Sequence, residues 1–360
     1  MNDYTAQRNK PIRVYSPQLL FQGIIEDHDS LLWKRRYYEP GEFELKAPIT
    51  DHNRNLLRPG NILTLRNAGE AMFIEDLENE DTSNAKQLVR AGRALSAYFD
   101  FRRIGTPLNP TAYFSGPVED AMHFLINFCA PLPLVELGNV QGFPEVVEFQ
   151  ATMKNLSSYL TKLSRASGIG YRLRPDFKQK KLFFETYKGV DRTLSQGVNS
   201  RVIFSEAYEN LNEVRYRYND QLFATEVVVG GEGEGTDRVY VTIGGGSGLQ
   251  LRQGFCDAKD LRSDNLSPAQ YRANLRQRGL EWMAGHCINE SLEFKTDPTV
   301  NFNYREHYDL GDLVTAEKRE WEQQVDQRLT ELQETYEHGG MSVDPTMGDP
   351  LPESIDWRDE

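Results

Sequence analysis

Near its amino end the chain reads Pro59-Gly60-Asn61-Ile62-Leu63-Thr64, and near its carboxyl end a similar phrase returns as Leu310-Gly311-Asp312-Leu313-Val314-Thr315. In each copy a glycine followed by Asn or Asp suits a tight turn, and the apolar residues after it suit a half-buried strand. A second strand-like run follows each copy, at residues 71–78 and 326–334. The two copies predict a duplicated strand-turn-strand unit, although Gly-Asp before a β-branched run is also common at unrelated strand starts.

The length of 360 residues exceeds one ordinary hydrophobic core, so two or three domains are expected. The N-terminus has no basic region before an apolar core, and no apolar run reaches the roughly 20 residues that a membrane helix needs. We therefore expect neither a signal peptide nor stable membrane insertion. Cys129, Cys256 and Cys287 are widely separated, which is typical of small buried hydrophobes in a reducing compartment.

The formal net charge of -13 argues against a surface that grips duplex nucleic acid, because phosphate binding depends on clustered Lys and Arg. The same charge suits simple solubility, and it equally suits a surface past which nucleic acid slides without binding. Composition alone favours solubility.

The first 105 residues read as mainly β. Residues 32–38 alternate so that Trp33, Arg35 and Tyr37 share one face of a strand, and Glu39-Pro40-Gly41-Glu42 predicts the turn of a hairpin. Residues 106–200 predict a middle module of two amphipathic helices followed by a hairpin, because apolar residues recur there at helical spacing.

From about residue 201 to residue 343 the pattern returns to β, with residues 214–218, 223–229 and 239–243 as strands. Ser267-Pro268-Ala269-Gln270 has the form of a capping box, so a helical insertion is expected over about 256–290. Residues 344–360 are acidic and Pro-rich, which predicts a C-terminal tail.

The glycine clusters do not carry the parts that phosphate binding or nucleophilic catalysis needs. Gly244-Gly245-Gly246-Ser247-Gly248 fails as a nucleophile elbow, because Leu249 stands where that motif needs glycine. Neither this cluster nor Gly230-Gly231-Glu232-Gly233-Glu234-Gly235 has dinucleotide spacing or a terminal Lys-Ser/Thr. Flexible hairpin connections are the favoured interpretation.

The titratable residues that could form a catalytic or metal site are weak candidates for similar reasons. Asp27-His28-Asp29 favours an imidazolium, but no second His or Cys nearby completes a metal site, so a turn is expected. His286 and Cys287 are neighbours on a predicted helix and point about 100° apart, which favours helix packing. Carboxylates that could suggest glycoside hydrolysis, or simply an exposed strand, are Glu75, Asp76, Glu78, Glu80 and Asp81. We therefore assign no catalytic, cofactor-binding or metal-ligating residue and expect no cofactor.

Several structural motifs follow one another in the chain. They are Trp33-x-Arg35-x-Tyr37-x-Glu39-x-Gly41-x-Phe43-x-Leu45, Gly60-Asn61-Ile62-Leu63, Gly231-Glu232-Gly233-Glu234-Gly235, Asp312-Leu313-Val314 and Glu334-Thr335-Tyr336-Glu337-His338-Gly339-Gly340. In this order they resemble the tail-hub, or baseplate-hub, proteins of long-tailed bacteriophages and prophages. The resemblance spans roughly residues 12–345.

The resemblance implies an α+β, mainly β fold. It implies similar β-barrel domains over residues 1–105 and 201–343, a middle helix-plus-hairpin domain over 106–200, the helical insertion in the second barrel, and the tail from 344. It further implies a structural, non-enzymatic hub protein. Three chains would contribute six barrels to a pseudo-six-fold ring that joins the tail tube to the tip around a channel for DNA.

The implied partners are two further copies of the chain, the tail-tube, distal-tail and tape-measure proteins, and tip-fibre or receptor-binding proteins. DNA would pass without specific binding, and the protein would lie at the virion tail tip after assembly in the host bacterial cytoplasm. Two other classes stay open, a tail-associated cell-wall hydrolase and a carbohydrate- or receptor-binding module of the tip, because one fold hosts many functions.

Overall fold

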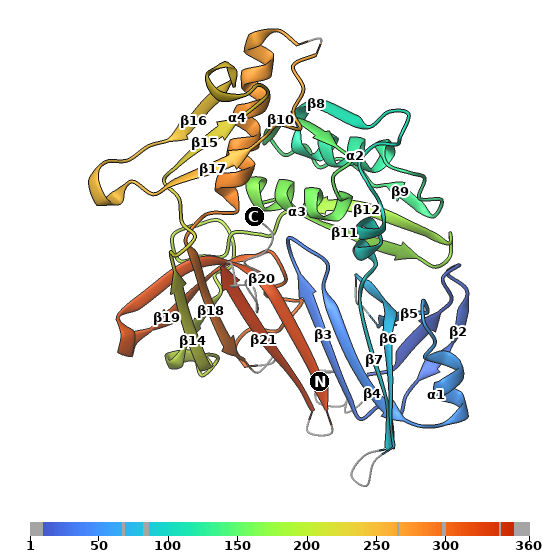
Figure 1. Ribbon diagram of the computed structural model, residues 1–360. Coiled ribbons are helices and arrows are strands. Elements are labelled where there is room, and N and C mark those ends of the chain that lie inside the picture. Colours follow the sequence, from blue (N-terminus) through green and yellow to red (C-terminus); the bar gives the residue numbers. More distant parts are fainter. Residues whose placement is uncertain are drawn as a thin grey trace.

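A computed structural model describes residues 10–66, 69–81, 86–264, 266–296, 300–337 and 340–348. The fold is α+β and mainly β, as the sequence predicts. Figure 1 shows a large sheet in the lower part of the molecule, with a middle module and a strand-helix insertion above it.

The large sheet contains two groups of strands with the same order. The first group consists of β1 (Ile12–Tyr15), β3 (Ser30–Arg36), β4 (Glu42–Pro48), β5 (Ile62–Leu65), β6 (Ala71–Asp81) and β7 (Lys86–Ala94), with β2 (Phe21–Ile25) beyond β1 and the short helix α1 (Asp51–Leu56) between β4 and β5. The second group consists of β13 (Ile203–Ser205), β14 (Asn212–Asn219), β18 (Asn289–Lys295), β19 (Leu313–Lys318), β20 (Gln323–Glu337) and β21 (Gly340–Gly348).

Each strand of the first group has a counterpart in the second. Across the sheet the order is β3-β4-β7-β6-β5-β1 in the first half and β14-β18-β21-β20-β19-β13 in the second, and the counterparts follow the same order along the chain. The halves differ at one pair, because β1 is antiparallel to β5 whereas β13 is parallel to β19. The duplication predicted from the two Gly-Asn and Gly-Asp phrases therefore extends to the topology of both halves.

The first of the two duplicated turns has a defined hydrogen-bond pattern. Asn61 N donates to Arg58 O at 3.1 Å, and Gly60 has φ of 78°, which glycine adopts without steric cost. Gly60 N donates to Ile74 O at 2.8 Å, and Ile74 N donates to Asn61 O at 2.9 Å. The pairing of β6 with β7 shifts register between Ile74 and Asp76, so a bulge follows this contact.

The second turn repeats each of these features. Asp312 N donates to Asp309 O at 3.2 Å, and Gly311 has φ of 92°. Gly311 N donates to Leu329 O at 2.8 Å, and Leu329 N donates to Asp312 O at 2.8 Å. The pairing of β20 with β21 shifts register between Leu329 and Glu331. Ile74 and Leu329 therefore hold equivalent positions, each next to a duplicated turn and at the start of a bulge.

The two halves are joined because β20 has two partners on one edge. Residues 323–328 of β20 pair with β19, and residues 331–337 pair with β3. The resulting path of paired strands ends at β2 and β14, so the halves are open in the part of the chain that the structure describes. In two separately closed barrels, this edge of β20 would pair with a strand of its own half. Here it pairs with β3 instead, so the strand pairing differs from that arrangement.

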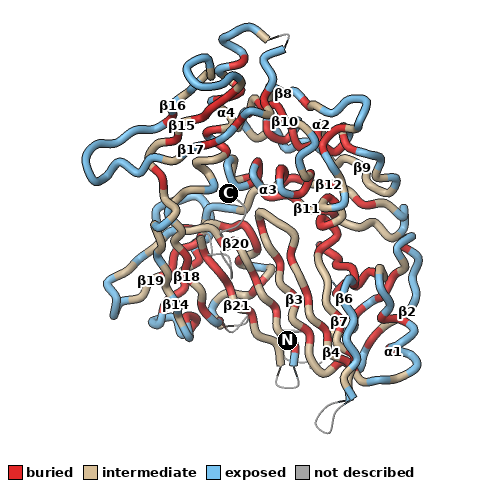
Figure 2. Tube along the Cα trace, viewed as in Figure 1, coloured by how far each residue is buried: buried red, intermediate tan, exposed pale blue. Residues whose placement is uncertain are grey.

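Alternation of buried and half-buried side chains distinguishes the two faces of this sheet. β3 and β4 alternate strictly, and Trp33 lies opposite Phe43 with ring centroids 5.9 Å apart on the buried face. Figure 2 shows the same alternation along β20. The hairpin predicted around Pro40 and Gly41 is confirmed, and each half has its own apolar core on this face.

The middle module covers part of the first half. It consists of β8 (Thr111–Pro117), α2 (Val118–Phe128), β9 (Val135–Leu137), β10 (Val146–Thr152), α3 (Leu156–Ser167), β11 (Gly170–Asp176) and β12 (Lys181–Tyr187). The two predicted helices and the predicted hairpin, β11 with β12, are confirmed. Phe73 and Tyr15 of the large sheet belong to the same apolar cluster as α2 and α3, so this module packs directly on the first half.

The insertion is larger than predicted. β15 (Glu226–Gly230), β16 (Tyr240–Gly244) and β17 (Gln253–Asp257) form a separate sheet against α4 (Pro268–Ala284), with Val227, Val229 and Leu275 in their shared core. Assignment of residues 223–229 and 239–243 to the second barrel is therefore wrong, because their apolar faces pack under α4. The predicted capping box at Ser267 is confirmed. The whole insertion lies between β14 and β18, where the first half has the short β3–β4 turn.

The predicted tail begins too early. Residues 344–348 belong to β21, with Val343 and Met347 buried and Pro345 opposite Leu332. Within β21 only residues 346–348 pair with β18, so Pro345 lies in an unpaired stretch of that edge, where a missing N–H is tolerated. Residues 349–360 of the predicted tail, and His338 and Gly339 of the closing motif, lie outside the described residues.

Candidate functional site

The titratable candidates from the sequence do not converge. His28 is buried in the connection between β2 and β3, and within the described ranges no three His, Cys, Asp or Glu side chains are grouped to hold a metal ion. His286 and Cys287 follow α4 instead of lying on it, since the helix ends at Ala284. The His286 ring stacks on Trp282 with centroids 3.4 Å apart, which is a packing role.

The glycine clusters connect strands of the insertion. The cluster at 230–235 joins β15 to β16, which are antiparallel partners, so the hairpin interpretation is confirmed there. The cluster at 244–248 begins at the last residue of β16 and leads to β17, which pairs with β15 and not with β16, so the hairpin interpretation is wrong there. A Cβ on Gly244, which has φ of 85°, would approach Thr225 O to 2.1 Å, so this position needs glycine for its backbone conformation and close packing.

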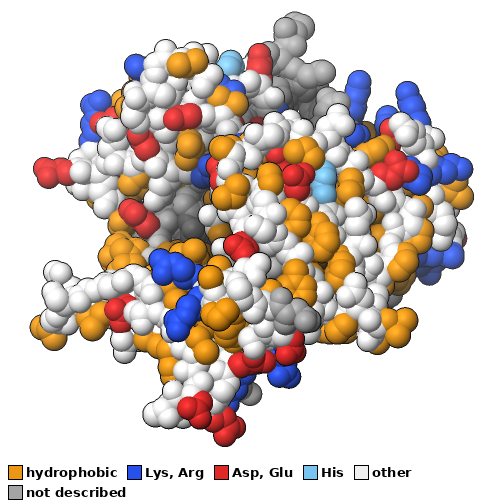
Figure 3. All heavy atoms as spheres, turned by 90° about the horizontal axis from the view of Figure 1, so that it is seen from above, with side chains coloured by type: hydrophobic (Ala, Val, Ile, Leu, Met, Phe, Trp, Pro, Cys, Tyr) orange, Lys and Arg blue, Asp and Glu red, His pale blue; other side chains and the backbone are white. Residues whose placement is uncertain are grey.

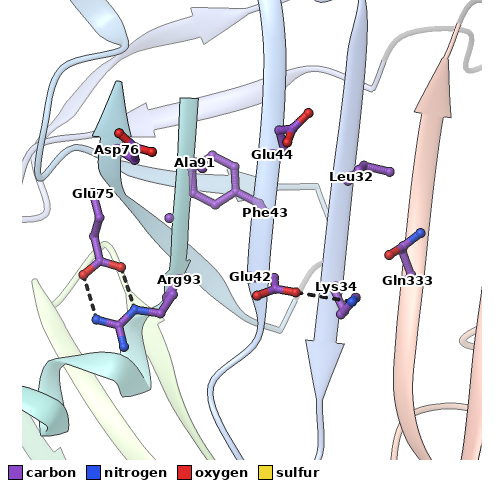
Figure 4. A pocket seen from close by; sticks show the side chains of 11 residues that line it. Leu32, Lys34, Glu42, Phe43, Glu44, Glu75, Asp76, Ala91, Arg93 and Gln333 are labelled. Atoms are coloured by element: carbon purple, nitrogen blue, oxygen red, sulfur yellow. Dashed lines mark hydrogen bonds and ion pairs between the residues drawn. The ribbon is translucent and has the colours of Figure 1, made fainter. Parts of the chain in front are cut away.

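The carboxylates of residues 75–81 lie on β6, as the exposed-strand interpretation predicts. Glu75 and Asp76 line a shallow groove of about 460 Å³ on the outer face of β3, β4 and β7, where Glu75 binds Arg93 at 2.7 Å (Figure 4). In the same groove burial raises the pKa of Glu42, but Arg36 and Lys34 outweigh this and hold that pKa below its ordinary value. A general acid needs the opposite shift.

A buried polar cluster fastens the two halves where β3 meets β20. Arg35 of β3 is 4% exposed and donates to Tyr304 Oη at 2.9 Å and to Asp309 Oδ1 at 2.5 Å, both in the second half. It also contacts Glu70 Oε1 of the first half at 3.2 Å. Burial alone would lower the pKa of the Arg35 guanidinium, but these partners outweigh burial and raise that pKa. This charge is therefore satisfied only while both halves are in place.

Glu334 of β20 completes the cluster. It accepts hydrogen bonds from Tyr304 Oη at 2.8 Å, Arg305 Nη2 at 2.5 Å and Tyr336 Oη at 2.5 Å. Burial raises the pKa of this carboxyl, but Arg305, Lys10 and Arg35 outweigh burial, so the pKa stays below its ordinary value. The cluster is arranged to hold charges, and its chemistry is that of a structural lock between the halves.

Tyr37 connects this junction to the middle module. Its hydroxyl donates to Gly168 O at 3.0 Å and to Tyr187 O at 3.1 Å. Gly170 and Gly311 approach its ring so closely that an added Cβ would come within 2.5 Å and 2.4 Å of it. Arg35 and Tyr37, both in the motif that carried the resemblance, thus hold three parts of the molecule together.

On each side of this junction, beyond intervening strands, lies a strand edge that has no neighbour in the described part of the chain. β6 pairs with β5 only up to Phe73 and has no strand on that edge over residues 76–81, and β14 pairs with β18 alone, within the described part of the chain. Arg215 and Arg217 of β14 line a concave surface of about 850 Å³ on the outer face of the sheet. The acidic residues of β6 and the strand at 214–218 are apparent in the sequence, but these edges are not, since strand neighbours are not encoded locally.

The face seen from above has no single dominant charge (Figure 3). On the face seen from above, Lys and Arg side chains stand in small groups among acidic and apolar ones (Figure 3). None of the helices in the described ranges has the length and apolar character to cross a membrane.

Solved structures share this architecture. The tail protein from Neisseria meningitidis MC58 has a TM-score of 0.60 at 12% identity, covering 95% of this chain and 97% of that chain. The prophage tail protein gp18 from Listeria monocytogenes EGD-e has a TM-score of 0.57 at 14% identity, covering 96% of each chain. The 43 kDa tail protein of prophage MuSo2 from Shewanella oneidensis has a TM-score of 0.56 at 12% identity, covering 95% of this chain and 99% of that chain.

The fold is therefore that of phage and prophage tail proteins, as the resemblance implied. Over residues 11–349 the sequence also matches the family described as Siphovirus ReqiPepy6 Gp37-like protein, and the chain belongs to this family. Among curated proteins none matches the chain.

Proposed function

We propose that this tail protein is the structural hub of the tail tip, a trimer whose six sheet halves form a pseudo-six-fold ring between the tail tube and the tip. The observation that carries the proposal is the repeat within one chain, with its shared strand order, turn and bulge. A chain with two similar halves lets three copies present six similar units to a six-fold tube. Each half serves as one barrel-like unit of the ring, with residues 106–200 as the domain beside it.

The outer face of the sheet suits a channel wall past which DNA moves without binding. Three cations of this face are held by carboxylates on the same face, Lys34 by Glu42 at 3.3 Å, Arg36 by Glu331 at 3.0 Å, and Lys46 by Glu44 at 3.2 Å. Phosphate binding needs free Lys and Arg that release counterions. Paired cations offer the passing backbone little net positive charge.

The proposed role is non-enzymatic and takes place in the virion, after assembly in the host cytoplasm. Its partners are the tail-tube, distal-tail and tape-measure proteins and the tip fibres or receptor-binding proteins. Support comes from the tail-protein fold and from the polar cluster at the junction, whose charges are satisfied by one another.

Electron microscopy of the purified protein, alone and with tail-tube protein, tests the proposal. We expect a three-fold ring of six similar units, formed at least when tube protein is present. Particles of another symmetry, or no ring with the tube protein, would contradict it. Clearing of peptidoglycan by the purified protein would favour the cell-wall hydrolase. Host-cell binding that is lost when surface aromatics are changed would favour the receptor-binding module.

A further inference from the structure

We infer that neighbouring copies of the chain join by a strand pair, in which residues 76–81 of β6 lie antiparallel to β14 of the next copy, with Glu78 opposite Arg217 and Glu80 opposite Arg215. This inference rests on the proposed ring and adds to it the two strands, their register and the charges that select it. It follows from a junction that already exists within the chain.

The junction between β20 and β3 is the template. Before its bulge, β20 pairs with β19, and after the bulge the same edge pairs with β3. In this junction Glu334, five positions after Leu329, lies opposite Trp33. β6 is the counterpart of β20, since it pairs with β5 before its own bulge. After the bulge that edge has no strand in the described ranges.

The strand that would pair with the open edge of β6 is the strand that corresponds to β3 in the second half. In the first half, Trp33 pairs with Phe43, Phe43 with Gly92, and Gly92 with Ile74 at the bulge. In the second half the same steps are taken by Tyr216, Leu292, Met347 and Leu329. β14 therefore occupies the place of β3, and its own outer edge is unpaired in the part of the chain described.

The template also gives the register. Ile74 and Leu329 are equivalent, so Asn79, five positions after Ile74, corresponds to Glu334 and lies opposite Tyr216 of the next copy. Because the strands are antiparallel, Glu78 then faces Arg217 and Glu80 faces Arg215. Two acidic residues meet two basic residues without any adjustment of the register.

Charge supports this register independently of the topology. Neither Arg215 nor Arg217 has an ion-pair partner among the described residues, whereas Arg36 at the internal junction binds Glu331 of the opposing strand at 3.0 Å. Opposite charges that face each other across strands stabilise the pairing, and like charges oppose it. The pairing between copies would place a carboxylate beside Arg217, which faces Ser291 within the chain, and a second one beside Arg215, which faces Glu293.

The buried face gives a second independent match. Leu77 is 39% exposed and Tyr218 is 54% exposed, and both lie on strand edges that have no neighbouring strand in the described residues. In the inferred register these two residues lie opposite each other. Their counterparts at the internal junction, Leu332 and Arg35, are 0% and 4% exposed. Pairing between copies would remove both apolar surfaces from water.

One main-chain group of β6 already has a partner, since Glu78 O accepts from Arg90 Nη1 at 2.7 Å. A carbonyl oxygen has two lone pairs, so this bond is compatible with an added strand. Each copy offers one β6 edge and one β14 edge, at opposite sides of the β20–β3 junction (Figure 1). The contact is therefore heterologous and generates a ring when the rotation closes.

Charge reversal tests the register. We expect Glu78→Arg with Glu80→Arg, and separately Arg215→Glu with Arg217→Glu, to abolish ring particles, and all four changes together to restore them. Glu234→Arg with Asp237→Arg, on the exposed connection of the insertion, changes the net charge by the same amount as the Glu78 and Glu80 changes and should leave the rings intact. Circular dichroism of each variant checks that the fold is retained.

A cross-link gives a readout that does not depend on loss of assembly. In a Cys287→Ser background, Asn79→Cys with Tyr216→Cys should yield covalent dimers and trimers on oxidation of assembled rings, because directly opposed residues have Cβ atoms about 4.5–5.5 Å apart. Each single variant should yield none. Assembled rings that give no such cross-link, or a cross-link to tail-tube protein instead, overturn the inference.

Different outcomes would contradict the strand pairing and the hub. If the wild-type protein forms a six-unit ring and both charge-reversed pairs assemble as well, the strand pairing is wrong and the hub proposal stands. If the wild-type protein forms no ring with tube protein, the hub proposal itself is wrong. Loss of rings in both reversed pairs without rescue by the four changes together also overturns the register.

Discussion

Leu77 of β6 and Leu332 of β20 stand at equivalent positions, three residues after the equivalent residues Ile74 and Leu329, yet Leu332 is fully buried and Leu77 is 39% exposed. The difference lies in their neighbours, since β3 covers Leu332 and no described strand covers Leu77. The same sheet position is thus an interior site in one half and an edge site in the other.

This pair gives the first prediction. Leu332→Ala should destabilise the unassembled chain by about 2–5 kcal/mol, the usual cost of a large-to-small change in a core. Leu77→Ala should cost less than about 1 kcal/mol, because its side chain is partly in water already. Urea unfolding of both variants at low protein concentration measures the difference. Equal losses would contradict the assignment of Leu77 to an open edge.

The lock between the halves gives the second prediction. Arg35→Met leaves Glu70 and Asp309 without their shared guanidinium, and removal of one partner from a buried ion pair typically costs about 3–5 kcal/mol. The matched control is Lys46→Met, whose exposed pair with Glu44 should contribute about 0–1 kcal/mol. Denaturant midpoints of the two variants measure this. A midpoint for Arg35→Met close to that of the control would contradict the lock.

The third prediction concerns the pH dependence of Lys10. Burial lowers the pKa of this ammonium to about 8, partly offset by Glu334. The unfolded chain therefore holds the Lys10 proton more tightly than the folded chain does. Because of this difference, the contribution of Lys10 makes the free energy of unfolding rise as pH increases from about 8 towards 10.5. Relative to wild type, Lys10→Met should be most favourable near pH 7 and lose that advantage near pH 10. Unfolding free energies of both proteins across this range measure it, and a pH-independent difference would contradict it.

The duplicated turn gives the fourth prediction. Both glycines have positive φ, so alanine at either position should cost about 1 kcal/mol or more from backbone strain. Gly311→Ala should cost more than Gly60→Ala, because the new Cβ would come within 2.4 Å of the Tyr37 ring, whereas the Cβ at Gly60 meets its nearest atom at 3.4 Å. Thermal unfolding of the two variants compares them. The reverse order would mean that the Tyr37 contact relaxes at little cost.

Local patterns were sufficient for the elements that depend on local chemistry. The turn glycines, the alternation of β3 and the capping box at Ser267 all appear in a few consecutive residues, and each is confirmed. The sequence also placed the acidic residues of β6 on an exposed strand. None of these patterns needs knowledge of a distant neighbour.

The errors concern pairing between distant segments. Residues 223–229 read as one more strand of the second half, and only contact with α4 assigns them to the insertion. Proline at 345 read as a tail, but its neighbours Val343 and Met347 pack in the core of the second half. The buried cluster around Arg35 joins residues more than 260 positions apart, so no local signal could reveal it.

The insertion between β14 and β18 shows where the two copies of the repeat were free to diverge. In one copy that position is a hairpin turn, and in the other it holds a sheet and helix with their own core. A turn at the end of a strand pair is a site where added chain leaves the existing ladders intact. A different insertion at this point would therefore leave the strand pairing of the large sheet unchanged.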